Sequence, residues 1–102
     1  MSINESLIGK KCVVRTYSAG CWFGTVEQKE GHEIILANAR RMHSWWAAES
    51  YSLSAVALYG LKHDRSGVIA AVPAIWLEAI ELIPATDVAI KSIEGAQNAK
   101  AR

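Results

Sequence analysis

The sequence has little excess charge, few cysteines and no long apolar run, and each of these shortages excludes a class of protein. Eleven basic and ten acidic residues leave a formal net charge of +1, whereas a binder of long nucleic acids draws its affinity from many basic contacts to phosphates. Two cysteines are too few for a disulfide scaffold or a four-thiolate zinc site. No apolar stretch reaches the roughly 20 residues that cross a bilayer, and the first residues lack the features of a signal peptide. We therefore expect a cytoplasmic protein that binds neither a membrane nor long nucleic acid.

Motifs of the common nucleotide-dependent enzymes are missing as well. There is no Walker-type phosphate loop and no GxGxxG dinucleotide fingerprint. The histidines His32, His43 and His63 are scattered, without the spacing of a metal site. Cys21 and one of these histidines could form a nucleophilic pair in space, but nothing in the sequence selects such a pair. We therefore predict no enzyme activity, no catalytic residues, no metal and no cofactor.

Length and composition indicate one small globular domain. The chain has 102 residues, of which 51% are hydrophobic, enough for a single core. We assign residues 1–95 to one ligand-binding domain and residues 96–102 to a flexible C-terminal tail. A domain of this size is marginally stable alone, and apolar surface left at its edges favours self-association, so we expect a homo-oligomer.

The pattern of apolar and turn-forming residues predicts an α+β fold, with a small, mostly antiparallel, curled β-sheet and two or three short helices. Strands are predicted over residues 11–17, 22–26, 33–37 and 68–72. Helices are predicted over residues 50–59, capped by Ser50 or Ser52, and over residues 87–94, capped by Thr86. Residues 75–83 fit either a helix or a strand that ends before Pro84, and we favour the strand.

The first candidate binding cluster lies at the end of the first predicted strand. Alternation places Arg15 and Tyr17 on one face, where a guanidinium and a phenol can grip a phosphate and stack on a base. The glycine and small residues that follow let a ligand approach the backbone. Phe23 is a further stacking candidate. The alternative is that Tyr17 and Phe23 are core aromatics and that Arg15 is an edge residue whose stem covers apolar surface.

The second candidate cluster follows the third predicted strand, where the sequence shows no clean periodicity. Arg40 and Arg41 are followed closely by Trp45 and Trp46, and Arg and Trp are enriched at interaction hot spots. Arginine supplies forked donors for phosphate, tryptophan supplies a stacking platform, and Asn38 can bond a base edge through both amide atoms. The alternative is a subunit interface that buries the tryptophans. The two alternatives are compatible if the ligand lies at that interface.

These clusters carry a resemblance to a known family. The blocks Arg-Thr-Tyr-Ser-Ala-Gly at residues 15–20 and Asn-Ala-Arg-Arg at residues 38–41 resemble the first-described type of phage Thoeris anti-defence protein, with further matches in register over roughly residues 9–94. Members of that family are sponges, which bind cyclic ADP-ribose isomers made by bacterial TIR-domain proteins and do not cleave them. Some members also bind the cyclic oligonucleotides of CBASS systems, such as cyclic trinucleotides, at a separate site. The family forms dimers that can assemble into hexamers, with ligand held where subunits meet.

The resemblance implies an immune-evasion protein that acts in the cytoplasm of the infected bacterial host. It places in the ligand region the residues that match the two blocks: Arg15, Tyr17, Ser18, Asn38, Arg40 and Arg41. Phe23, Trp45 and Trp46 are added on physical grounds, as stacking or interface candidates. The rival functions are a small enzyme that hydrolyses the same nucleotides, a β-barrel that binds single-stranded nucleic acid, and a purely structural phage protein in which Trp45 and Trp46 only hold subunits together.

Overall fold

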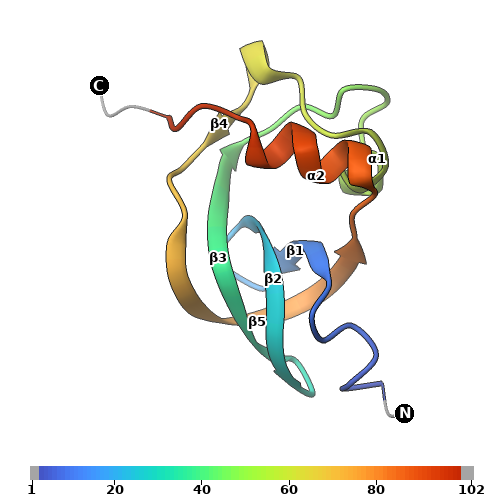
Figure 1. Ribbon diagram of the computed structural model, residues 1–102, viewed down its shortest axis with the longest axis vertical. Coiled ribbons are helices and arrows are strands. Elements are labelled where there is room, and N and C mark those ends of the chain that lie inside the picture. Colours follow the sequence, from blue (N-terminus) through green and yellow to red (C-terminus); the bar gives the residue numbers. More distant parts are fainter. Residues whose placement is uncertain (1–2, 100–102) are drawn as a thin grey trace.

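The computed structural model of the chain describes residues 3–99 and confirms the α+β class (Figure 1). Its elements in chain order are β1 (Lys11–Thr16), β2 (Cys21–Glu30), β3 (Glu33–Ser44), α1 (Leu53–Tyr59), a 3-10 turn (His63–Arg65), β4 (Gly67–Val68), β5 (Val72–Pro84) and α2 (Asp87–Glu94). The strand order is β2-β1-β5-β3-β4, and each neighbouring pair is antiparallel. Because β2 also pairs with β3, strands β1, β2, β3 and β5 close into a small barrel.

Two apolar cores follow from alternation along these strands. Val14 and Trp22 face each other across β1 and β2 inside the barrel, whereas their neighbours Val13 and Phe23 face outward under the helices. The barrel core consists of Cys12, Val14, Trp22, Val26, Ile34, Leu36, Ala39, Leu77 and Ala79. The second core joins the outer face of the sheet to both helices, which lie together across one end of the barrel (Figure 1).

The two helices begin and end where local signals place them. Ser52 caps α1, since its side chain accepts a hydrogen bond from the Ala55 amide at 3.1 Å. Thr86 caps α2 in the same way at 3.2 Å. Gly60 ends α1 with a φ of 88°, and a Cβ there would lie 2.4 Å from Cβ of Ser92, so glycine permits the close approach of α2. Within residues 3–99 neither helix has the length and apolar character needed to cross a bilayer.

Strand β3 runs on to Ser44, beyond the predicted end at residue 37. The prediction ended too early because a β-bulge interrupts the alternation of buried and exposed side chains at that point. Thr25 pairs with Ala37, but Phe23 pairs with Arg40, so Asn38 and Ala39 together oppose one residue of β2. Asn38 has a φ of 50°, which asparagine tolerates better than most residues. The extra residue shifts the pattern of inward and outward side chains, which explains the missing periodicity in this part of the sequence.

Two further differences and one confirmed prediction concern the second half of the chain. The strand predicted over residues 68–72 is divided, since β4 ends at Val68 and β5 begins at Val72. Residues 75–83 do form a strand, as part of the longer β5. Residues 96–99, assigned to the flexible tail, pair with β4 through a bridge between Asn98 and Val68, and the Ala99 amide donates to Val68 O at 2.8 Å. Residues 100–102 of that tail lie outside the described part of the chain.

Candidate functional site

The two sequence blocks meet at one end of the barrel through Arg41. Trp22 and Arg41 are cross-strand partners, and Cζ of Arg41 lies 4.4 Å from the centre of the Trp22 ring. Nη1 of Arg41 donates to Ala19 O at 3.3 Å, and Nε1 of Trp22 donates to the same oxygen at 3.0 Å. Trp22 is buried while Arg41 is exposed. A guanidinium held on an indole in this way keeps its charge at the surface, where it can meet an anion.

The turn between β1 and β2 is fixed by the buried hydroxyl of Thr16. Oγ1 of Thr16 donates to Gly20 O and accepts from the Ala19 amide, each at 2.8 Å. Gly20 has a φ of 81°, which favours glycine at this position. The turn is therefore a defined structure that presents the exposed Ser18 beside the Arg41 contact at Ala19.

Tyr17 and Ser18 lie on the side of this turn that faces β5. They line a small pocket of about 80 Å³ together with Trp76 and Glu78. The Tyr17 ring is 60% exposed and meets His32 edge to face, with ring centres 5.9 Å apart. The side chains of Tyr17 and Ser18 are both exposed, so both can contact a ligand. The pocket that they line is nevertheless smaller than one nucleotide base.

Arg15 does not share a face with Arg41. Because Val14 faces the barrel interior, Arg15 faces outward, where its Nε donates to Oε1 of Glu81 at 2.6 Å. Both side chains are about half exposed. An exposed ion pair of this kind contributes about 1 kcal/mol or less, so Arg15 can exchange Glu81 for a phosphate at little cost.

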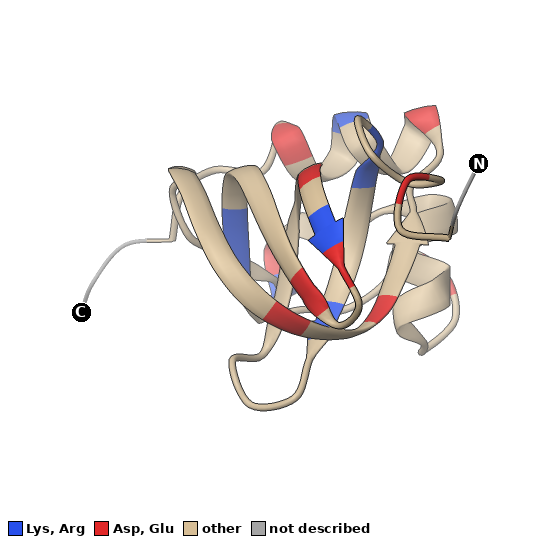
Figure 2. Ribbon diagram, turned by 90° about the horizontal axis from the view of Figure 1, so that it is seen from below, with Lys and Arg blue, Asp and Glu red and all other residues tan. Residues whose placement is uncertain are grey.

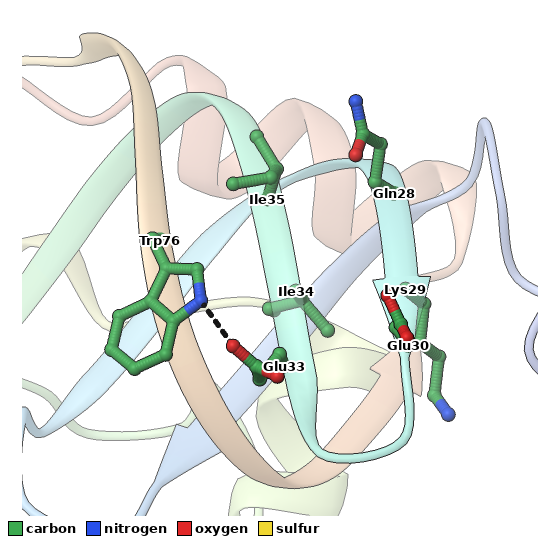
Figure 3. A pocket seen from close by; sticks show the side chains of 7 residues that line it. All are labelled: Gln28, Lys29, Glu30, Glu33, Ile34, Ile35 and Trp76. Atoms are coloured by element: carbon green, nitrogen blue, oxygen red, sulfur yellow. Dashed lines mark hydrogen bonds between the residues drawn. The ribbon is translucent and has the colours of Figure 1, made fainter.

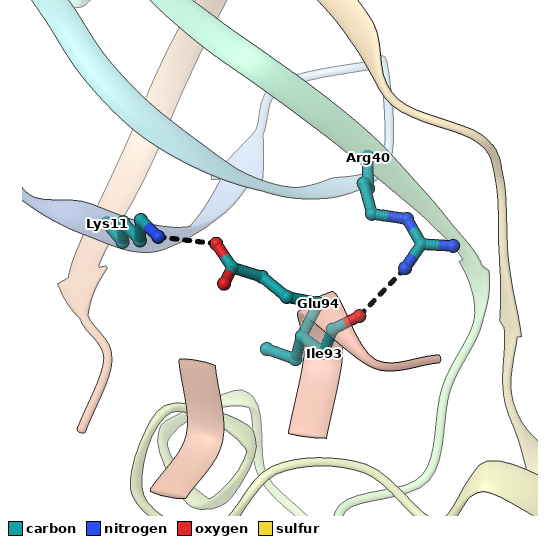
Figure 4. A network of polar contacts seen from close by, with 4 residues as sticks. All are labelled: Lys11, Arg40, Ile93 and Glu94. Carbon is teal, nitrogen blue, oxygen red and sulfur yellow. Dashed lines mark hydrogen bonds and ion pairs between the residues drawn. The ribbon is translucent and has the colours of Figure 1, made fainter. Parts of the chain in front are cut away.

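Arg40 is a structural residue, which corrects its assignment to the ligand region (Figure 4). Its side chain is 7% exposed and lies against the C-terminal end of α2. It donates to Ile69 O, Ile93 O, Ala96 O, Val68 O and Asn98 Oδ1. Burial lowers the pKa of the guanidinium, but an arginine so placed stays charged at neutral pH. All five N–H groups of Arg40 are thus engaged, and none is left for a ligand.

Phe23 is also a core residue, and the prediction that it stacks on a ligand is wrong. It is 2% exposed and packs in the core beneath the helices. The alternative considered from the sequence, a core aromatic, is correct for Phe23. Asn38 is exposed, and its clearest role is the backbone conformation of the bulge.

The two tryptophans are separated from the arginines that precede them. Trp45 packs partly against the core beneath the helices, and Trp46 is 46% exposed. Both line an open pocket of about 200 Å³ with Tyr51. The cation that accompanies Trp46 is Arg65, whose Cζ lies 5.2 Å from the ring centre. Sequence reasoning missed Arg65 because it stands in a polar loop 19 positions along the chain.

Across residues 3–99 no three side chains of His, Cys, Asp or Glu lie close enough together to hold a metal ion. What the arrangement around Arg41 can do is bind an anion and stack on a planar group.

Comparison with known protein families gives a match over most of the chain. A family model described as "Domain of unknown function (DUF6948)" matches residues 9–93, which is most of the chain. No curated protein and no solved structure is significantly similar to the chain.

Proposed function

The chain belongs to the family described as a domain of unknown function, DUF6948, and we propose that it sequesters a small anionic nucleotide without cleaving it. The proposed ligand class is the cyclic ADP-ribose isomers, on the resemblance of residues 15–20 and 38–41 to the phage sponges. The observation that carries the proposal is the contact between these two blocks, in which Arg41 stacks on Trp22 and donates to Ala19.

The chemistry of such a ligand matches what this surface presents. A cyclic ADP-ribose isomer carries a planar base, two riboses and a pyrophosphate with about two negative charges at neutral pH. A charge-assisted hydrogen bond from Arg41 is worth about 1.5–3 kcal/mol. Because the Trp22 ring already holds the guanidinium in place, less side-chain freedom is lost when a phosphate binds.

The pockets lined by the candidate residues are too small to enclose the ligand within one copy of the chain. The pockets beside Tyr17 and Trp46 hold about 80 and 200 Å³, whereas sites that bury a drug-sized ligand hold roughly 300–1,000 Å³. A sponge needs slow release, and slow release follows from enclosure. The proposal therefore includes a homo-oligomer in which a second copy covers the ligand on Arg41. Exposed apolar side chains such as Tyr51 and Leu58 provide surface for that association.

The test is calorimetric titration with cyclic ADP-ribose isomers and, separately, with cyclic trinucleotides. Arg41→Gln should weaken binding at least about tenfold, the loss of roughly one charged contact. Lys91→Gln is the control, since it removes one exposed positive charge on α2, away from every candidate ligand residue in the sequence. Equal affinity of wild type and Arg41→Gln would refute the site. The ligand recovered after denaturation should be intact by chromatography, and recovered fragments would indicate a hydrolase instead.

A further inference from the structure

One face of the barrel carries an exposed tryptophan beside a row of carboxylates. Ile35 pairs with Trp76 on β5 and with Gln28 on β2, so these three side chains lie side by side (Figure 3). In the next row outward, Glu33 pairs with Glu78 and with Glu30. Positions two apart on a strand share a face. The six residues Gln28, Glu30, Glu33, Ile35, Trp76 and Glu78 therefore form one surface, here called the acidic aromatic face.

Trp76 forms a ridge between two hollows on this face. Its side chain is 53% exposed, and its Nε1 donates to Oε1 of Glu33 at 3.0 Å, which fixes the orientation of the ring (Figure 3). On one side is a pocket of about 220 Å³, lined by Gln28, Lys29, Glu30, Glu33, Ile34, Ile35 and Trp76. On the other side is the smaller pocket beside Tyr17. A large aromatic ring held in water between two hollows is suited to stacking against a partner.

The carboxylates of this face have no cationic partner within residues 3–99, where the ion pairs are Lys11–Glu94 and Arg15–Glu81. Lys29, the nearest basic residue along β2, extends away from Trp76 (Figure 3) and donates to Asn4 Oδ1 and Gly31 O. Seen from the hairpin end, acidic positions on β2, β3 and β5 gather on this side of the barrel (Figure 2). Like charges directly opposite on neighbouring strands are destabilising. The carboxylates of Glu30, Glu33 and Glu78 therefore repel one another, and a bound cation would reduce that repulsion.

We propose that the acidic aromatic face docks an extended cationic segment of a partner protein, with an arginine stacked on Trp76 and bonded to Glu33 or Glu78. Arginine fits better than lysine because its planar guanidinium can lie on an indole while forking to a carboxylate. The three carboxylates Glu30, Glu33 and Glu78 make a cationic partner more favourable on this face than an anionic one. A metal ion is disfavoured because the carboxylates lie in a row and do not converge. This docking surface shares the small pocket beside Tyr17 with the candidate ligand region, but the contacts proposed here, to Trp76 and the carboxylates, do not require a bound nucleotide.

The test is NMR titration of the ¹⁵N-labelled protein with a short Gly-Ser peptide that carries two arginines at alternate positions. The same peptide with citrulline, which keeps the shape and removes the charge, is the control ligand. The Trp76 indole N–H resonance should shift with the arginine peptide and stay unmoved with the citrulline peptide. Glu33→Gln and Glu78→Gln should each weaken binding about threefold or more. Glu49→Gln, the same charge change on the loop before α1, should leave binding unchanged.

Substitution of the tryptophan separates stacking from folding. Trp76→Ala should abolish the arginine-specific shifts across the face, and Trp76→Phe, which keeps a ring, should retain most of the binding. Equal binding of the citrulline peptide, or no effect of either glutamate variant, would overturn the proposal. The proposal is also overturned if the face is buried between copies of this chain, in which case Trp76→Ala would convert an oligomer to monomer in analytical ultracentrifugation.

Discussion

Replacement of Arg40 by methionine should unfold the C-terminal end of the protein and lower its stability. The substitution keeps an unbranched side chain of similar length but removes the donors to Ile69 O, Ile93 O, Ala96 O and Val68 O. The Ile93 and Val68 carbonyls each keep one other donor, so the loss is smaller than for fully orphaned groups. With about 1–3 kcal/mol for each buried group left without its charged partner, we expect a total of about 3–5 kcal/mol, similar to breaking a buried ion pair.

That loss is large for a domain whose total stability is about 5–15 kcal/mol. It corresponds to a fall of at least about 12 °C in Tm for a chain of this size. Urea unfolding followed by circular dichroism measures the free energy, and hydrogen exchange at the Ala96 and Ala99 amides reports whether the segment beside β4 opens. Arg41→Met is the control, since Arg41 is exposed and should cost less than about 1 kcal/mol.

The result that would refute this reasoning is an Arg40→Met protein with wild-type stability and wild-type protection at those amides. A second contrary result is loss of nucleotide binding at unchanged stability, which would return Arg40 to the ligand site. Arg40→Lys distinguishes charge from geometry, because lysine keeps the charge but lacks the planar fork of donors. We expect it to recover less than half of the lost stability.

Three further predictions concern the barrel. Gly24→Ala should cost about 1–3 kcal/mol in urea unfolding, because a Cβ there would lie 2.8 Å from both Ala37 O and Cγ of Leu36; wild-type stability would show that the bulge can move aside. Glu78→Gln should stabilise the protein by about 0.2–1 kcal/mol at low salt and by less in high salt, and a destabilised variant would contradict the repulsion across the sheet. Burial raises the pKa of the Cys12 thiol to about 11 from its ordinary 9.0. The unfolded thiol therefore ionises first, and between pH 9.0 and about 11 the folded state loses up to about 2–3 kcal/mol relative to a Cys12→Ala variant. Parallel pH dependence of the two proteins would refute that assignment.

The helices of the fold were predictable because their signals are local. Ser52 and Thr86 cap the next residues along the chain, and Gly95 follows the last turn of α2. The strand at residues 75–83 could be predicted from its β-branched composition. The contact between Trp46 and Arg65 could not be predicted from the sequence. It depends on how α1 and the 3-10 turn reverse the direction of the chain. Nor could the burial of Phe23 be distinguished from exposure, since either face of a strand accepts an aromatic ring.

The bulge at Asn38 decides which way the side chains of Arg40 and Arg41 point. The Asn-Ala-Arg-Arg block therefore carries information about the fold as well as about a ligand. Leu36 faces the barrel interior, so strict alternation would place Arg40 inside and Arg41 under α2. The bulge at Asn38 reverses this order: Ala39 fills the barrel, Arg40 reaches the C-terminal carbonyls of α2, where the helix dipole favours a cation, and Arg41 reaches Trp22. Asn38, Ala39 and Arg40 thus each have a role in the fold. In this chain the block therefore has structural reasons for its bulge and its anchored C-terminus, and Arg41 is the arginine of the block that stays exposed.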